Sequence, residues 1–476
     1  MESRADETLP PTGIRLVADT ALDRRDRGRL LIGGAPLRII RLSDAGAEML
    51  AAWLEGTPLA DDTQARTLAR RLLDAAVVHP VVDPIGDPDA TVVIPAYNDA
   101  DGLACCLASL GDLPVVVVDD ASRNAAEIAA ACEKHGARLL RHDTNQGPAA
   151  ARNTGLAAVT TSLVAFVDTD VEAWPGWINH LVGHFGDRRV AAVAPRVRSR
   201  PGDSLLERYE THHSPLDLGA NPASVAPHNP VSYVPAAALV ARVDAVTEIG
   251  GFDSGMRTGE DVDLVWRLTD SGKVVRYDPS VDVEHRPRRS WTALLGQRRN
   301  YGSSAAALGI RHGARVAPAR CSGWSAAAWA ALAAGHPILG LGLAAGSAVA
   351  LKRKLGPLPD SLPTTARIAG IGHLHAGYGI ARAVARVWWP PATLLALIRP
   401  RSQRLIVAAV FGPPLLDWIR GSRPAGLPRS LALRLADDLA YGTGIWQGVL
   451  QTGDATSLTP DLPSGPTQTV ETQTDS

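Results

Sequence analysis

Four short apolar runs, each closed by polar or acidic residues, constrain the fold of this chain more than any other feature. The runs are TVVIPAYN, LPVVVVDDAS, ARLLRHDTNQG and SLVAFVDTD, and stretches with helical spacing separate them. Alternating strands and helices are typical of a parallel sheet covered by helices, and such sheets bind ligands at the carboxyl ends of their strands. The sequence therefore predicts an α/β domain with a Rossmann-like sheet over residues 86–310, and a site among the residues that close the strands.

The formal net charge of −1 combines regions of opposite charge. Residues 285–434 contain 21 Lys and Arg and two acidic residues, whereas residues 435–476 contain six acidic residues and no base. The first 284 residues therefore carry a formal charge of −14. This asymmetry predicts an anionic partner for the basic region. No nucleic-acid-binding motif accompanies the basic residues, so we do not expect nucleic acid to be that partner.

Residues 1–85 have the pattern of a small separate domain. Two apolar runs joined at Gly33-Gly34 indicate a β-hairpin. Ser43 is a typical N-cap for a first helix, and a second helix is expected over residues 62–76. Short strands combined with two or three helices predict a winged-helix-like domain.

Residues 311–450 are predicted to be helical, basic and associated with a membrane. Residues 321–351 lack Lys, Arg, Asp and Glu, and a run of this length is a candidate for burial in a membrane. Shorter apolar stretches at 387–398 and 405–419 carry Trp next to Arg or are bounded by Arg, which is typical of a membrane interface. The alternative is an Ala- and Gly-rich helical domain packed on the α/β domain. Residues 451–476 are rich in Thr, Pro, Asp and Ser and are predicted to be a disordered tail.

Cysteine usage and the N-terminus bear on the compartment. The four cysteines have no spacing that suggests a zinc site or a disulfide framework, which favours a reducing compartment. No basic segment followed by an apolar run is present at the N-terminus, so a secretory signal is not expected. We expect the protein at the cell membrane with its α/β domain in the cytoplasm.

Asp168 and Asp170 follow the apolar run LVAFV. Two carboxylates two residues apart can hold a hard divalent cation, Mg²⁺ or Mn²⁺, that also contacts a diphosphate. A D-x-D sequence in a loop is also typical of a solvated turn, and the pair alone leaves both interpretations open. His285, after the strand-like YDPSVDVEH, is either a structural histidine or a third metal ligand.

Asp119 and Asp120 close the run VVVV. Adjacent carboxylates at a strand end are costly unless a partner accepts them, although a turn gives them an ordinary role as well. Pro95 and Tyr97 close the first run. Together these four residues can line a pocket in which a carboxylate accepts a nucleobase N–H and the aromatic ring stacks on the base.

The segment NQGPAAARNTG enters a helix from a turn at Gly147. It brings Arg152 into the first turns, where the guanidinium and the free backbone N–H groups can face phosphate. The alternative is an ordinary capped helix with no ligand.

The segment GGFDSGMRTGEDVDLVWRL supplies candidates for acid–base chemistry. Helical spacing places Glu260 and Asp261 at the N-terminus of a helix, where the helix dipole favours carboxylates. Such a cluster is commonly no more than a cap, but Gly250, Gly251 and Gly259 leave backbone room for a ligand. A carboxylate at this place can act as a general base towards an acceptor hydroxyl.

In this order, VVIPAYN, VVVDDAS, NQGPAAARNTG, FVDTD, GGFD, GEDVDL and a later histidine resemble the glycosyltransferases of family 2, which have the GT-A fold. The resemblance implies a metal-dependent, inverting transfer from a nucleotide sugar. Together with the residue patterns above, it assigns nucleotide-sugar binding to Pro95, Tyr97, Asp119, Asp120, Gly147, Arg152 and Asp168, metal binding to Asp168, Asp170 and His285, and general-base catalysis to Asp261 with Glu260 beside it.

The first 85 residues resemble the peptide-recognition domains of the pyrroloquinoline-quinone D type. Joined to a family 2 transferase and a membrane-like region, they are similar to glycosyltransferases that add β-1,4-linked glucose from UDP-glucose to a peptide-derived redox cofactor. Two alternatives stay open. One is a glycosyltransferase for a lipid-linked cell-envelope glycan, and the other is a non-catalytic scaffold that binds a peptide and a sugar nucleotide.

Overall fold

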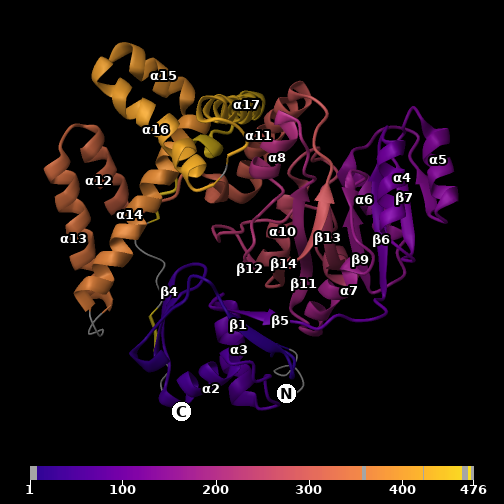
Figure 1. Ribbon diagram of the computed structural model, residues 1–476, viewed down its shortest axis with the longest axis horizontal. Helices are drawn as coiled ribbons and strands as arrows, with labels where there is room; N and C mark the ends of the chain where they lie inside the picture. The colour runs from indigo at the N-terminus through magenta and orange to yellow at the C-terminus, as the bar shows by residue number, and fades with distance from the viewer. Residues whose placement is uncertain (1–7, 356–360, 422, 464–469, 473–476) are drawn as a thin grey trace. The chain divides into compact units, whose positions relative to one another are not determined.

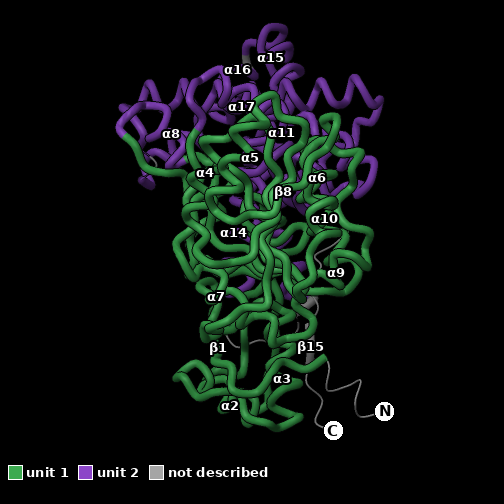
Figure 2. Tube along the Cα trace, turned by 90° about the vertical axis from the view of Figure 1, so that its right-hand side faces the viewer, with its two compact units in different colours: residues 1–202, 213–287, 468–476 green, residues 203–212, 288–467 purple. Residues whose placement is uncertain are grey.

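The computed structural model describes residues 8–355, 361–421, 423–463 and 470–472. The chain forms two compact units, which Figure 2 shows in different colours. Unit 1 comprises residues 1–202, 213–287 and 468–476, and unit 2 comprises residues 203–212 and 288–467. Every candidate site residue named above belongs to unit 1.

A central sheet dominates unit 1, and nine strands of it lie within the described residues. The strands follow the order β10-β14-β11-β13-β9-β6-β7-β8, with β12 paired to β14. One half of the sheet is parallel and consists of β6 (Ala90–Ala96), β7 (Val115–Asp119), β8 (Arg138–Arg141) and β9 (Leu163–Val167). These strands are the four apolar runs of the sequence, so the predicted α/β fold is confirmed.

The other half of the sheet is mixed, and of its strands only β14 was predicted in part, as the strand-like YDPSVDVEH. Its strands are β10 (Val171–Glu172), β11 (Val190–Ser199), β12 (Ala223–Val225), β13 (Ala238–Arg242) and β14 (Val274–His285). β13 runs antiparallel between β9 and β11, and β14 is parallel to β11. β10 pairs antiparallel with the end of β14, which sets Val171 opposite His285. This pairing brings the segment after β9 next to the last residue of β14.

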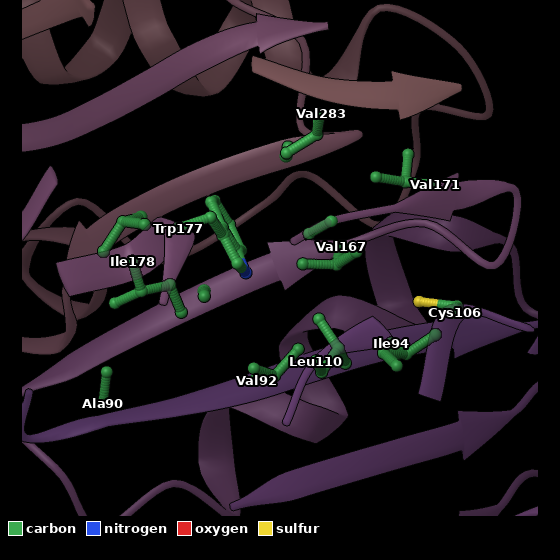
Figure 3. Close-up of a cluster of buried hydrophobic side chains, with 14 of the residues drawn as sticks. Ala90, Val92, Ile94, Cys106, Leu110, Val167, Val171, Trp177, Ile178 and Val283 are labelled. Atoms are coloured by element: carbon green, nitrogen blue, oxygen red, sulfur yellow. The ribbon is translucent and has the colours of Figure 1, made fainter. Parts of the chain in front are cut away.

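Helices cover the sheet and bury its faces (Figure 1). They are α4 (Ala100–Ser109), α5 (Ala125–Lys134), α6 (Pro148–Ala157), α7 (Trp177–Val182), α9 (Val243–Glu248) and α10 (Glu260–Asp270). Figure 3 shows Val92 of β6, Val167 of β9 and Trp177 of α7 in one apolar cluster. All three side chains are fully buried, and such close packing leaves little freedom to the strand ends.

Residues 8–81, together with residues 470–472, form a smaller part of unit 1. Two sheets lie within its described residues: β1 (Arg15–Ala18) with β5 (Val78–Val81), and β2 (Asp23–Arg25), β3 (Leu30–Gly33), β4 (Arg38–Arg41) and β15 (Val470–Thr472). The strands of the first sheet are antiparallel, and β15 lies parallel to β4. Two helices, α2 (Asp44–Leu54) and α3 (Thr63–Asp74), complete this part.

Local sequence signals explain these elements. The Ser43 hydroxyl accepts a hydrogen bond from the Gly46 N–H at 3.1 Å, so the predicted N-cap is confirmed. Gly34 lies in the turn between β3 and β4 with φ +86°, and a Cβ there would be 2.2 Å from the Ala75 carbonyl oxygen. The predicted hairpin and both predicted helices are therefore present. The winged-helix-like classification and the peptide-binding role stay predictions.

Unit 2 is helical, as predicted for most of its length. Its helices are α8 (Leu205–His213), α11 (Trp291–His312), α12 (Gly323–Ala333), α13 (Pro337–Leu355), α14 (Ser361–Arg386), α15 (Trp389–Ile398), α16 (Pro400–Ile419) and α17 (Leu427–Thr452). The uncharged run 321–351 is divided between α12 and α13, because Gly335 takes a left-handed φ of +84° and Pro337 begins the next helix. Within the described residues, no helix combines the length and the apolarity that crossing a membrane requires.

A buried charge cluster joins three helices of unit 2. Arg298 of α11 has a side chain 2% exposed, and its Nε lies 3.2 Å from Oδ2 of Asp437 in α17. The Tyr209 hydroxyl of α8 donates to the same oxygen at 2.9 Å, and Glu210 Oε1 lies 3.6 Å from Arg298 Nη2. This cluster was not predicted from the sequence, because its members lie far apart in the chain.

Candidate active site

The predicted site residues gather at the carboxyl ends of the sheet strands. Tyr97 follows β6, Asp119 is the last residue of β7, Asp168 follows β9 and His285 is the last residue of β14. β7, β6 and β9 are adjacent and parallel, so their ends lie at one edge of the sheet. The residues predicted for the site therefore lie at one edge of the sheet, and their roles stay predictions.

Arg152 of α6 links two of the predicted carboxylates. Its Nη1 donates to Glu260 Oε1 and its Nη2 donates to Asp168 Oδ1, each at 2.7 Å. The guanidinium also lies 5.4 Å from the centre of the Phe252 ring, and the side chain is 5% exposed. Burial opposes the positive charge, but the two carboxylates raise the pKa of Arg152 above its ordinary value, so it stays charged. In the structure Arg152 therefore has two carboxylate partners. The predicted contact of Arg152 with a phosphate of the ligand stays a prediction.

His285 and Asp170 lie together, as the predicted metal site requires. His285 Nε2 is 3.2 Å from Asp170 Oδ2, and the Arg286 N–H donates to the Asp170 carbonyl at 2.8 Å. Asp168 has one oxygen on Arg152, yet its side chain is 32% exposed. Burial, together with the charge of Asp170, raises the pKa of the Asp168 carboxyl in spite of Arg152.

The donor set suits a hard divalent cation, because carboxylate oxygens and an imidazole nitrogen are ligands that such cations accept. Within the described ranges, however, no group of three or more His, Cys, Asp or Glu side chains is arranged to hold a metal ion. Asp168 Oδ1 accepts from Arg152, and Asp170 Oδ2 lies next to His285 Nε2. The metal site at these residues stays a prediction.

The first turn of α10 carries three acidic residues that differ in their partners. Glu260 is bound to Arg152, and Asp263 Oδ2 accepts from Arg267 Nε at 2.7 Å. Within the described residues, the hydrogen bonds to Asp261 come from two backbone groups: Val262 N–H at 2.8 Å and Ala236 N–H at 3.4 Å. Burial, followed by the charge of Glu260, raises the pKa of Asp261 to about 7, although Arg152 lowers it.

Asp119 is fully buried and already has donors from its own chain. Its Oδ1 accepts from the Ser122 N–H at 2.9 Å, and its Oδ2 accepts from Arg141 Nη1. Tyr97 is 49% exposed next to this strand end, and Pro95 is half-buried. The aromatic ring is thus open to a ligand, while the carboxylate is engaged.

Asp120 organises the loop that leads into α6. Its two oxygens accept from the backbone N–H groups of Gln146 at 2.8 Å and Gly147 at 2.7 Å, and His142 Nδ1 lies 2.8 Å from Oδ1. Gly147 has φ +96°, and a Cβ there would lie 3.5 Å from the side chain of Arg257. The predicted site residues Asp120 and Gly147 therefore touch each other directly.

Three further polar residues at this edge were not singled out from the sequence. Arg141 binds Asp119, His142 binds Asp120, and Arg257 Nη1 donates to Asn145 Oδ1 at 2.6 Å. Arg141 is the last residue of β8 and His142 follows it. Both could have been predicted in the same way as the other site residues, which were chosen because they stand at the ends of strands. Arg257 lies in the glycine-rich segment before α10. A positively charged residue in such a segment is the sequence feature that could have identified it.

The sheet carries carboxylates at its strand ends, and Arg152 links one of them to the acidic start of α10. This arrangement is the basis for comparing the chain with known protein families. Residues 91–246 match the protein family Glycosyl transferase family 2. The chain belongs to this family and is a glycosyltransferase, as the sequence motifs predict.

Full-length similarity is found to a particular relative. The Pre-mycofactocin glycosyltransferase of Mycobacterium tuberculosis is 39% identical over 476 residues, which cover 96% of this chain and 99% of the relative. Glycosyltransferase AglE of Haloferax volcanii is 29% identical over 220 residues, 44% of this chain and 70% of that protein. Among solved structures, mannosyltransferase PcManGT from Pyrobaculum calidifontis, in complex with GDP-Man and Mn²⁺, has a TM-score of 0.42 and 18% identity, covering 75% of this chain and 89% of that one.

Proposed function

We propose that the chain transfers a hexose, glucose from UDP-glucose, onto the peptide-derived redox cofactor mycofactocin or its precursor. The observation that carries this acceptor is the 39% identity to the Pre-mycofactocin glycosyltransferase over 99% of that relative. The resemblance of residues 1–85 to peptide-recognition domains suits a peptide-derived acceptor. The β-1,4 linkage and the use of UDP-glucose rest on the resemblance of the whole arrangement.

Asp261 is the general base in this proposal. Glu260 and Asp263 each have an arginine partner, Arg152 and Arg267 respectively. Asp261 has backbone partners and a pKa of about 7, so it can accept a proton near neutral pH. The three neighbouring acids thus separate into two that are paired with arginine and one that is available to an acceptor hydroxyl.

The reaction is a single displacement. The acceptor oxygen forms a bond to the anomeric carbon, its proton passes to Asp261, and the bond to the diphosphate breaks with its electron pair on the leaving oxygen. One displacement inverts the configuration at that carbon. A single available carboxylate base at α10 suits this course better than a covalent intermediate, which requires a nucleophile in addition.

Asp168, Asp170 and His285 are the residues that we propose hold Mg²⁺ or Mn²⁺. The cation, when bound, supplies positive charge to the leaving diphosphate. Arg152 keeps Asp168 and Glu260 in place and contributes a permanent positive charge behind them. Pro95 and Tyr97 offer the stacking surface for the base, and Asp119, Asp120 and Gly147 shape the loop around it.

The proposed activity is tested by product mass. The protein is incubated with UDP-glucose, other nucleotide sugars and the purified peptide-derived acceptor, with a lipid-linked glycan as the rival acceptor. A hexose added to the peptide-derived acceptor from UDP-glucose supports the proposal, and a product on the lipid-linked glycan alone favours the rival enzyme. If no UDP is released with either acceptor, the non-catalytic scaffold is favoured.

The base is tested with Asp261→Asn in the same assay. We expect UDP release to fall about 10²- to 10⁴-fold, the usual contribution of a general base. Asp270→Asn, at the other end of the same helix, is the matched control and should keep full turnover. Equal UDP release by the wild type and Asp261→Asn would show that another group takes the proton.

The metal site is tested separately, by calorimetric titration of UDP in Mn²⁺, in Mg²⁺ and in EDTA. Asp170→Ala should lose the part of the UDP affinity that depends on the metal and keep the part that does not. Full transferase activity in EDTA would refute the metal assignment without affecting the assignment of Asp261.

A further inference from the structure

Two helices of unit 2, α15 and α16, leave large apolar side chains in solvent. In α15, Leu394, Leu397 and Ile398 are 56%, 75% and 67% exposed, and in α16, Leu405 and Val407 are 47% and 53% exposed. The two helices lie side by side and are joined at a single residue between them (Figure 1). A soluble protein rarely exposes neighbouring leucines to this extent unless they form an interaction surface.

Positive charge accompanies this surface. Arg399 separates the two helices and Arg404 follows in α16, and both side chains are exposed. Asp417 is the only acidic residue between positions 389 and 421 of the sequence, and its carboxylate accepts a hydrogen bond from Tyr378 at 3.0 Å. The segment with the exposed leucines therefore carries more cations than anions, and its one acidic residue is already hydrogen-bonded.

Aromatic residues border the same helices. Trp388 and Trp389 stand at the start of α15, and Trp418 lies one residue before the end of α16. The Arg423 guanidinium lies 4.8 Å from the centre of the Trp418 ring. Exposed aliphatic side chains with neighbouring Trp and Arg have the composition of an interfacial membrane segment.

We propose that residues 389–419, the α15–α16 hairpin, dock in the plane of a bilayer that contains anionic lipid. α15 has ten residues and so rises about 15 Å, half of a hydrocarbon core about 30 Å thick. Lying in the interface, the hairpin buries its leucines at the boundary of the acyl chains and holds Arg399 and Arg404 at the level of the phosphates. This gives the predicted membrane association a surface and a lipid preference, and it does not depend on which acceptor the enzyme uses.

Vesicle flotation of the full-length protein tests the hairpin. The wild type should float with vesicles of phosphatidylcholine and phosphatidylglycerol, and more weakly with phosphatidylcholine alone. Leu397→Ser with Ile398→Ser should lower the partition coefficient about a hundredfold on both kinds of vesicle, because two large aliphatic side chains lose their burial. Arg399→Gln with Arg404→Gln should lower it about thirtyfold on the anionic vesicles only.

The matched control replaces apolar side chains of unit 2 outside the hairpin. Ile310→Ser with Leu462→Ser changes residues that are 61% and 51% exposed and should leave flotation unchanged. Unchanged UDP release by each variant with a soluble acceptor verifies that the site is intact. Failure of the wild type to float, or equal flotation of Leu397→Ser with Ile398→Ser, would overturn the proposal. A wild-type dimer in light scattering that this variant converts to a monomer would instead assign the surface to a second copy of the chain.

Discussion

Two buried arginines, Arg152 in unit 1 and Arg298 in unit 2, each hold two carboxylates, and the two clusters differ in what lies next to them. Beside Arg152, the pKa of Asp261 is raised to about 7 by burial and by a neighbouring acid. Beside Arg298, the pKa of Asp437 lies below its ordinary value, because Arg298 and Arg434 outweigh the effect of burial. Similar ion pairs thus lie next to a carboxylate that can accept a proton in unit 1, and next to a carboxylate that stays ionised in unit 2.

The comparison separates a site for chemistry from a structural cluster. The carboxylate of Asp168, bound to Arg152, is 32% exposed, whereas that of Asp437 is 4% exposed and also accepts from a tyrosine. A cluster that keeps one carboxylate accessible and leaves a neighbouring one without a cation can exchange its partners for a ligand. The members of the Arg298 cluster are buried and paired with one another, and they connect α8, α11 and α17.

The largest expected effect is on stability, in unit 2. Arg298→Met leaves the carboxylates of Asp437 and Glu210 buried without their main cation, which should lower the free energy of unfolding by about 3–5 kcal/mol. Denaturant unfolding measures this loss, and kcat/KM per folded molecule should be unchanged. Adding Asp437→Leu and Glu210→Leu removes the two carboxylates that have lost this cation and should recover part of the stability. A large loss of kcat/KM with unchanged stability would show that the cluster is part of the active site.

In unit 1, Arg152→Met should act mainly on catalysis. Removal of the guanidinium frees Asp168 and Glu260 and takes away a charge that lowers the pKa of Asp261. We expect kcat/KM to fall about a hundredfold, as on removal of one electrostatic contact in a site. The acid limb of its pH profile should also move to higher pH. A merely structural role for Arg152 would lower the amount of folded protein and leave that limb in place, and Arg152→Lys, which keeps the charge, should show a smaller movement.

The parallel half of the fold could be predicted because its strands are continuous apolar runs, as strands buried on both faces are. Of the mixed half, only the YDPSVDVEH part of β14 was predicted, and its pairing was not, because β14 contains charged residues and Pro279 and has no clear strand period. The site residues at strand ends were predictable for the same reason as the strands. The hairpin in the first domain was predictable from its glycines, since Gly34 needs its left-handed φ.

Pairings across the site were beyond the sequence. Arg152 and Glu260 are 108 residues apart, and nothing in either segment shows that α6 and α10 meet. Spacing alone therefore left Glu260 and Asp261 equivalent as candidates for the base. The partners of Asp120 could not be predicted either, because they are mostly backbone N–H groups of the loop at Gly147, and such groups have no sequence signature. Tertiary contacts decide these roles, and the local pattern supplies only the candidates.

The smallest expected effect is a pH dependence, which distinguishes the two clusters. Because the pKa of Asp261 is raised to about 7, the carboxylate is mostly protonated below that pH and cannot accept a proton. kcat/KM should therefore fall about tenfold per pH unit below 7 and level off above it, since the basic form is then complete. The same linkage makes folding favour protonated Asp261, so its contribution to stability is lost as pH rises through 7, and Asp261→Asn should raise Tm more at pH 8 than at pH 5. Arg298→Met should leave the midpoint of the kcat/KM profile unchanged, and a midpoint that moves in that variant would mean that unit 2 sets the charge state of the base.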